Sequence, residues 1–181
     1  VRSLAFSPDG KWLATYAING VVTVWDVART DRVAQIAARA GNSTHKGVVG
    51  FSPRAQLLAM GETDGRIRLL DLPTCQERHV LPGPSEGITT LAFSPDGRLL
   101  ASASGYAVHS IQLWDMESLT LSTELPGRGG WVPCLAFSPD GKTLAAANAG
   151  GQSIELWDTQ PRKFIATLRG HLHELWAVAF S

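Results

Sequence analysis

The segment Phe93-Ser94-Pro95-Asp96-Gly97 decides the fold, because parts of it recur along the whole chain. Phe-Ser begins at intervals of 45, 42, 44 and 43 residues, at Phe6, Phe51, Phe93, Phe137 and Phe180. In three of the five places Phe-Ser is followed by Pro-Asp-Gly. A second series keeps the same phase, at Trp25-Asp26, Leu70-Asp71, Trp114-Asp115 and Trp157-Asp158. Two series in phase indicate one structural unit that is repeated about every 43 residues.

Residues 88–125 show what one repeat predicts. Apolar residues 88–93 lead into a Ser-Pro-Asp-Gly segment that fits a type I turn, with Pro at its second position and Gly at its fourth. Three further short strands are expected at 99–104, 111–114 and 119–125. The other repeats follow the same plan, so the sequence predicts small antiparallel sheets of four strands repeated about an axis.

In four of the five repeats the first strand carries large apolar residues at an irregular spacing, as in Ile88, Leu91 and Phe93. A step of three followed by a step of two breaks the alternation of a strand. We therefore expect a β-bulge just before the fourth residue of this strand, which re-aims the residues at its start. The residue before each phenylalanine is Ala or Gly, which fits a crowded position near the central axis.

These phased motifs resemble the WD-repeat β-propeller family, in which a Gly-His pair opens the repeat and Leu-Trp-Asp lies near its end. Gly170-His171 preserves the opening pair in this chain. The regular Phe-Ser-Pro-Asp-Gly resembles bacterial members in particular. The resemblance implies an all-β propeller of four-stranded antiparallel blades. It places four blades and the first strand of a fifth at approximately 1–40, 41–82, 83–126, 127–169 and 170–181. The chain would then be a fragment of a larger propeller or of a multidomain protein.

In that family a His, a Ser or Thr, an Asp and the Trp tie each blade together by hydrogen bonds. The hydroxyl position holds Thr15, Met60, Ser102 and Ala146 here, and the tryptophan position holds Trp25, Leu70, Trp114 and Trp157. No repeat keeps the full set. Because a buried polar group without a partner costs roughly 1–3 kcal/mol, we expect these blades to depend mainly on apolar packing.

Composition excludes several classes of function. The chain is 44% hydrophobic, and its 16 Lys and Arg balance its 16 Asp and Glu, which disfavours nucleic acid and membrane surfaces as partners. Cys75 and Cys134 stand far apart, and the pair His171 and His173 has no companion at ligand spacing, so no metal or other cofactor is expected. No export signal or membrane-spanning run is present, which favours the cytoplasm.

No catalytic constellation stands out either. The repeated aspartates recur at the blade period, whereas an active site needs one convergent set of residues. There is no GxSxG motif, and the Gly-Gly pairs lack the lysine of a phosphate loop. We therefore expect no enzymatic activity.

A partner-binding face is predicted from two tryptophans outside the Trp-Asp series. Trp131 and Trp176 fall at the start of the first strand, where family members expose residues on the narrow face of the propeller. Arg2, Thr89 and His45 occupy equivalent places in other repeats, and exposed Trp and Arg dominate protein interfaces. In the alternative interpretation, both tryptophans only cover the ends of neighbouring blades.

The function expected from these observations is a non-catalytic scaffold that binds a protein or peptide. One alternative is a propeller that senses a small ligand or accompanies an enzyme at its central channel. Another is a half-propeller that pairs with a second copy into a ring of eight blades. Further blades from the same parent chain are favoured over a second copy, because an open edge is an aggregation hazard.

Overall fold

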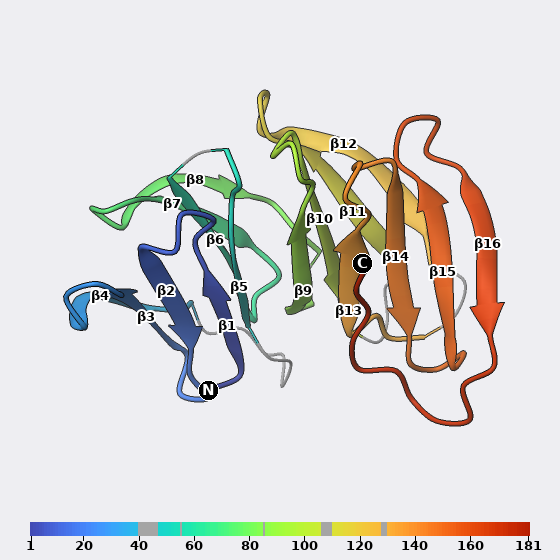
Figure 1. The fold of residues 1–181 in the computed structure, drawn as a ribbon, viewed down its shortest axis with the longest axis horizontal. Coiled ribbons are helices and arrows are strands. Elements are labelled where there is room, and N and C mark those ends of the chain that lie inside the picture. The colour runs from blue at the N-terminus through green and yellow to red at the C-terminus, as the bar shows by residue number, and fades with distance from the viewer. Residues whose placement is uncertain (40–46, 55, 85, 106–109, 128–129) are drawn as a thin grey trace. The chain divides into compact units, whose positions relative to one another are not determined.

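The computed structural model describes residues 1–39, 47–54, 56–84, 86–105, 110–127 and 130–181. Sixteen strands and no helix occur in these residues (Figure 1). The first sheet contains β1 (Ser3–Phe6), β2 (Trp12–Tyr16), β3 (Val21–Asp26) and β4 (Asp31–Ala37). The second contains β5 (Val48–Phe51), β6 (Leu57–Gly61), β7 (Ile67–Asp71) and β8 (Gln76–Leu81). The third contains β9 (Ile88–Phe93), β10 (Leu99–Ser104), β11 (Ser110–Asp115) and β12 (Thr120–Pro126). The fourth contains β13 (Cys134–Phe137), β14 (Thr143–Asn148), β15 (Ser153–Asp158) and β16 (Phe164–Arg169).

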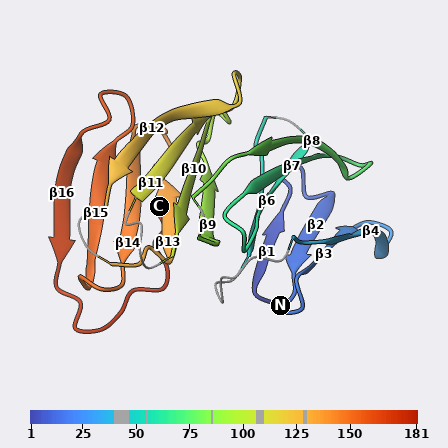
Figure 2. The same ribbon diagram turned by 180° about the vertical axis from the view of Figure 1, so that it is seen from behind.

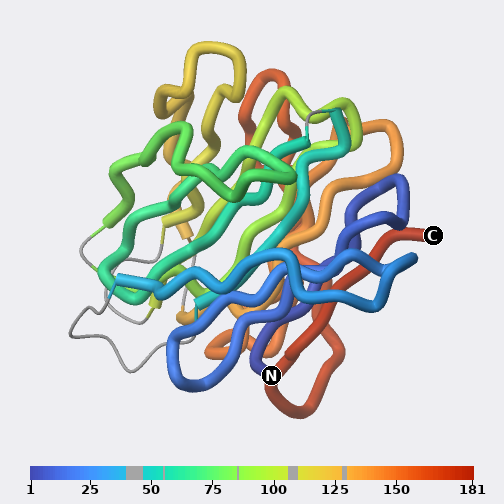
Figure 3. Tube along the Cα trace, turned by 90° about the vertical axis from the view of Figure 1, so that its left-hand side faces the viewer, coloured from blue at the N-terminus to red at the C-terminus, as the bar shows by residue number. Residues whose placement is uncertain are grey.

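Each sheet is an antiparallel meander, in which every strand pairs with its neighbour in the sequence. Figure 2 shows the same order from behind, and the tube in Figure 3 shows the chain reversing at one turn after another. The predicted fold class, repeated four-stranded antiparallel blades, is confirmed. The four sheets are called blade 1 to blade 4 below.

The chain divides into two compact units, Val1–Ile88 and Thr89–Ser181. Unit 1 holds blades 1 and 2, and unit 2 holds blades 3 and 4 apart from the first residue of β9.

The turn after the first strand closes as the sequence predicts. The amide of Gly10 donates to the carbonyl of Ser7 at 2.9 Å, and the corresponding bonds in blades 3 and 4 are 2.8 Å long. The glycines at the fourth position adopt φ values of 65° to 71°, where other residues are strained. The serine hydroxyl also donates to the aspartate two residues later, at 2.6 Å in blade 1, which holds the turn from inside.

The β-bulge predicted just before the fourth residue of the first strand is wrong for β1 and β13, whose pairing with the next strand is regular. Both strands begin only after the leading apolar residue, Val1 or Val132, so that residue lies outside the ladder and need not alternate. The bulges lie instead between the third and fourth strands. They interrupt the register at the start of the Trp-Asp pair or its equivalent, at Val24/Trp25, Leu69/Leu70, Leu113/Trp114 and Leu156/Trp157.

The expected strand of a fifth blade at 170–181 is absent, since residues 170–181 form no strand. A strand exists only when a neighbour completes its hydrogen bonds, and no described residue pairs with this segment in a ladder. The segment nevertheless packs against unit 2. Leu175 is buried, and the Cys134 thiol donates to the carbonyl of Val178 at 3.8 Å.

The core of each unit lies between its two blades. In unit 1 one face of blade 1 packs against the facing side of blade 2, through Ala14, Tyr16, Val22, Val24, Val49, Phe51, Leu58, Met60 and Leu70. In unit 2 blade 3 covers blade 4 in the same way, through Ala101, Ala103, Ile111, Leu113, Leu125, Leu135, Leu144, Ala146 and Trp157. Packing is close enough that a Cβ at Gly47 would overlap the ring of Tyr16.

Candidate interaction surface

The tryptophans of the Trp-Asp series are held differently in each blade. In blade 3 the indole N–H of Trp114 donates to the Ser102 hydroxyl at 2.9 Å, and both residues are buried. In blade 1 the indole of Trp25, which is 36% exposed, donates to Thr15 at a longer 3.3 Å. In these two blades the indole N–H therefore has a hydroxyl as its hydrogen-bond acceptor.

Blades 2 and 4 have lost this hydrogen bond. Blade 2 has Met60 and Leu70 at the two positions, and both side chains are fully buried. Blade 4 keeps Trp157 but has Ala146 in place of the hydroxyl, and the indole N–H makes no hydrogen bond with a described residue. The Trp157 ring instead meets Phe164 edge to face, with 5.3 Å between centroids.

The aspartates of the same series are bound to their own turns or to nearby side chains. Asp26, Asp115 and Asp158 accept backbone N–H groups two or three residues later, at 2.8 to 3.0 Å. Asp71 instead forms an ion pair with Arg78, at 2.9 Å between its Oδ1 and the arginine Nε. The amide and hydroxyl of Ser118 lower the pKa of the Asp115 carboxyl. These carboxylates have turn-closing or ion-pairing partners, as expected of structural rather than catalytic groups.

The two tryptophans outside the series lie together in unit 2. The rings of Trp131 and Trp176 meet edge to face, with centroids 5.0 Å apart and planes at 79°. Trp131 is half-buried, whereas 59% of Trp176 is exposed. The backbone of Trp131 is anchored, because its carbonyl accepts the amide of Ala149 at 3.0 Å. The pair thus presents one exposed aromatic ring on a fixed aromatic support.

Thr89 belongs to the same neighbourhood. Its hydroxyl lies 3.0 Å from the carbonyl of Val132, the residue after Trp131, and 3.1 Å from the carbonyl of Ala103. The structure therefore brings together three of the five residues predicted for the partner-binding face. Arg2 is exposed in unit 1, where its amide donates to the carbonyl of Tyr16 at 2.7 Å, and His45 lies outside the described residues.

Gly170 and His171 follow β16 directly, and both are exposed together with His173. Within the described part of the chain, no three His, Cys, Asp or Glu side chains gather as a metal ion requires. Nor do these residues include a helix of the length and apolarity that spanning a membrane requires.

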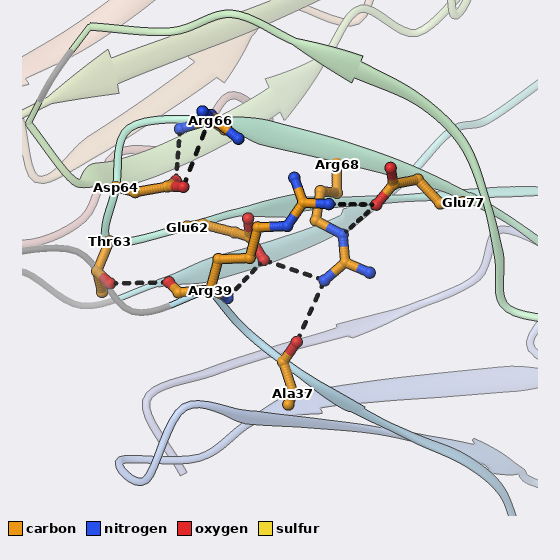
Figure 4. Close-up of polar contacts among 8 residues, drawn as sticks. All are labelled: Ala37, Arg39, Glu62, Thr63, Asp64, Arg66, Arg68 and Glu77. Carbon is orange, nitrogen blue, oxygen red and sulfur yellow. Dashed lines mark hydrogen bonds and ion pairs between the residues drawn. The ribbon is translucent and has the colours of Figure 1, made fainter.

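A charged cluster in unit 1 is a feature that the motif analysis missed (Figure 4). Glu62, directly after β6, is fully buried, and its Oε1 accepts the amide of Arg39 at 2.9 Å and the Arg68 guanidinium at 3.1 Å. The Nε of Arg68 pairs with Glu77 at 2.8 Å, and Arg39 reaches the same carboxylate at 3.4 Å. Figure 4 shows both arginines converging on these two glutamates.

The charged cluster also joins the two blades of unit 1. Arg68 in blade 2 donates to the carbonyl of Ala37 at the end of β4, at 3.2 Å, and Thr63 donates to the carbonyl of Arg39 at 3.3 Å. The sequence contains a sign of this cluster, because Glu62 and Arg68 carry opposite charges on either side of the turn between β6 and β7. The cluster therefore positions the end of blade 1 against blade 2.

Repeated four-stranded antiparallel blades are the architecture of a β-propeller repeat protein. The family model described as "WD domain, G-beta repeat" matches residues 1–26, 75–115 and 119–158, which together make up more than half of the chain. This chain belongs to the WD40 repeat family.

Curated relatives agree with this family. The chain is 28% identical to meiotic recombination protein rec14 of Schizosaccharomyces pombe, over 56% of this chain and 32% of that protein. It is 34% identical to WD repeat-containing protein SL1-17 of Schistosoma mansoni, over 56% of this chain and 33% of the relative. It is 31% identical to anaphase-promoting complex subunit cdc20 of Dictyostelium discoideum, over 65% of this chain and 22% of that protein.

The matched region thus spans about a third or less of these relatives. All three are eukaryotic proteins, so the bacterial type suggested by the regular turn motif gains no support from them.

Proposed function

We propose that this chain is a non-catalytic scaffold and that its second unit binds a protein or peptide through the Trp131–Trp176 pair. The observation that carries the proposal is the exposed Trp176 ring, which rests edge to face on an anchored Trp131. An exposed tryptophan offers a large apolar area that loses little conformational freedom when it is covered.

Two further observations support this proposal. Thr89 is bonded to the backbone beside Trp131, so the support of the exposed ring is tied to blade 3 as well as to blade 4. The Dictyostelium relative is named as a subunit of the anaphase-promoting complex, which is a multiprotein assembly. Arg2 and His45, at equivalent places in other repeats, remain proposed contacts of the same kind.

The test is a selection of displayed peptides against the purified chain, followed by measurement of Kd for the selected peptides. Trp176→Ala is expected to weaken binding at least tenfold, because truncating a central interface tryptophan costs about 2 kcal/mol or more. Ile165→Ala is the matched control, since Ile165 is 50% exposed on β16 of the same unit. Equal weakening by both variants, or none by either, would contradict the proposal.

A second candidate role is assembly with a further blade, which the exposed face of blade 1 favours. Leu4 and Phe6 are 62% and 57% exposed. In blade 4 the counterpart of Leu4, Leu135, is buried against blade 3, and the counterpart of Phe6, Phe137, packs against the same core. We propose that another blade covers Leu4 and Phe6 in the same way, supplied by the parent chain in preference to a second copy.

The light-scattering mass of the purified chain tests this second role. A discrete dimer that Phe6→Asp converts to monomer would assign the face to a second copy and overturn the preference for the parent chain. Mass that stays monomeric, or becomes polydisperse, while a longer parent segment gives a discrete monomer would support further blades.

A further inference from the structure

A groove in unit 1 lies on the edge formed by the turns that link first and second strands. It has a volume of about 180 Å³ and lies between the β1–β2 turn of blade 1 and the β5–β6 turn of blade 2. Trp12, Phe51 and Leu72 give it an apolar lining, and Asp9 and Arg54 stand among its polar residues. Drug-sized ligands occupy pockets of roughly 300–1,000 Å³, so this groove suits one side chain of a protein segment better than a small molecule.

Arg54 departs from the chemistry of the other three turns. Asp9, Asp96 and Asp140 stand at its place in the repeat, and each accepts the hydroxyl of its own serine and an amide two residues later. In blade 2 Arg54 contacts the serine through its backbone amide, which lies 3.4 Å from the Ser52 hydroxyl. A positive charge has replaced a negative one, and its side chain takes no part in closing the turn.

The Arg54 guanidinium is also unneutralised. Among the residues that the structure describes, none forms a hydrogen bond or ion pair with it, and the side chain is exposed. Asp9 on the opposite side is already engaged by the Ser7 hydroxyl at 2.6 Å, the Lys11 amide at 3.1 Å and the Lys11 ammonium at 3.6 Å. These hydrogen bonds lower the pKa of Asp9. The groove therefore offers one unpaired cation beside an apolar lining.

We propose that this groove docks an extended protein segment in which an apolar side chain adjoins a carboxylate, as in Leu-Glu. The apolar side chain covers Trp12 and Leu72, and the carboxylate pairs with Arg54, whose planar guanidinium suits two-point contact with a carboxylate. The site is separate from the Trp131–Trp176 pair, which lies in unit 2, so either proposal stands without the other.

The experiment titrates acetylated hexapeptides with a central Leu-Glu, Leu-Gln or Leu-Lys into the full chain and follows the indole N–H resonance of Trp12. Leu-Glu is expected to shift this resonance and to bind at least tenfold more tightly than Leu-Gln. The preference should shrink at high salt, because exposed charges are screened. Arg54→Glu is expected to reverse the charge preference, so that the Leu-Lys peptide binds most tightly of the three.

Arg29→Glu provides the matched control, since it makes the same change of charge in unit 1, on an exposed side chain outside the groove. It should leave the order of the peptides unchanged. Equal binding of Leu-Glu and Leu-Gln, an unchanged order in Arg54→Glu, or no movement of the Trp12 resonance at millimolar peptide would each overturn the proposal. None of these readouts depends on Trp176.

Discussion

Blade 2 and blade 4 have both lost a hydrogen bond that blade 3 keeps, yet they have lost it in different ways. Blade 2 has replaced both partners by apolar residues, Met60 and Leu70, which are fully buried. Blade 4 has replaced only the hydroxyl, so that the Trp157 indole N–H is buried without a hydrogen bond among the described residues. Losing both partners of a buried pair can be nearly neutral, whereas losing one leaves the full cost of desolvating the other.

The same rule gives the largest expected effect on stability, at the charged cluster of unit 1. Arg68→Met leaves the fully buried Glu62 without its cation, and we expect a loss of about 3–5 kcal/mol in the free energy of unfolding. Urea denaturation measures it. The double variant Glu62→Met/Arg68→Met should be more stable than Arg68→Met alone, because no buried charge remains uncompensated.

Arg66→Met serves as the control for that measurement. Its ion pair with Asp64 spans 3.7 Å at the surface, so its loss should cost about 1 kcal/mol or less. A similar cost for Arg66→Met and Arg68→Met would show that burial is not what makes the cluster important.

Blade 3 can be converted to the state of blade 4 by Ser102→Ala. The Trp114 indole is buried and would lose its 2.9 Å hydrogen bond, so we expect a loss of roughly 1–3 kcal/mol. A double-mutant cycle with Trp114→Phe isolates the bond, since removing the hydroxyl should cost less once the indole N–H is gone. An equal cost of Ser102→Ala in both backgrounds would refute the assignment.

Blade 4 can be converted to the state of blade 3 by Ala146→Ser. The new hydroxyl would accept the Trp157 indole, and we expect a gain of about 1 kcal/mol in the free energy of unfolding. Ala145→Ser is the control, because Ala145 is equally buried but is the neighbouring residue on β14, whose side chain points to the other face. It should destabilise the chain.

The smallest expected effect on stability concerns the Ser-Pro-Asp-Gly turns, and it depends on pH only in the acidic range. Hydrogen bonds from the Ser138 hydroxyl and the Lys142 amide lower the pKa of Asp140 below its ordinary value of 3.8. This carboxylate therefore contributes stability above pH 3.8 that is lost as the pH falls through the lower pKa of the folded state. The advantage of the wild type over Asp140→Asn should be constant near neutral pH and shrink below that value.

Denaturation curves collected between neutral and strongly acidic pH measure this dependence. Ser138→Ala removes the main cause of the lowered pKa and should weaken the effect. If the difference between wild type and Asp140→Asn did not change with pH, the turn would be held by its backbone alone. The turn of blade 2, with Arg54, has no carboxylate at this position to titrate.

Much of the architecture could be predicted from the repeat. The Ser-Pro-Asp-Gly turns and the strands of residues 88–125 follow from local chemistry, since proline, glycine and the alternation of apolar residues act over a few positions. The bulge was misplaced because the leading apolar residue, such as Val1, looks like part of the strand although the ladder starts at Ser3. Sequence spacing cannot show which residue begins a ladder.

The candidate surfaces depend on contacts between repeats, and these were harder to predict. Trp131 and Trp176 stand at nearly equivalent places one repeat apart, so the sequence could nominate both, but only the structure shows the two rings in contact. The sequence shows that Arg54 stands where the other turns have Asp. It does not show that the Arg54 side chain is unpaired, because this depends on which residues line the opposite side of the groove.

The meander order of the strands has a consequence for how the chain reaches this structure. Every ladder joins consecutive strands, so the residues that must meet first are close in sequence, as Phe6 and Leu13 are. Closing short loops costs little chain entropy, and topologies rich in such local contacts fold quickly. The pairing within a blade therefore does not wait for a neighbouring blade, and we expect the docking of the sheets to be slower than the closing of their hairpins.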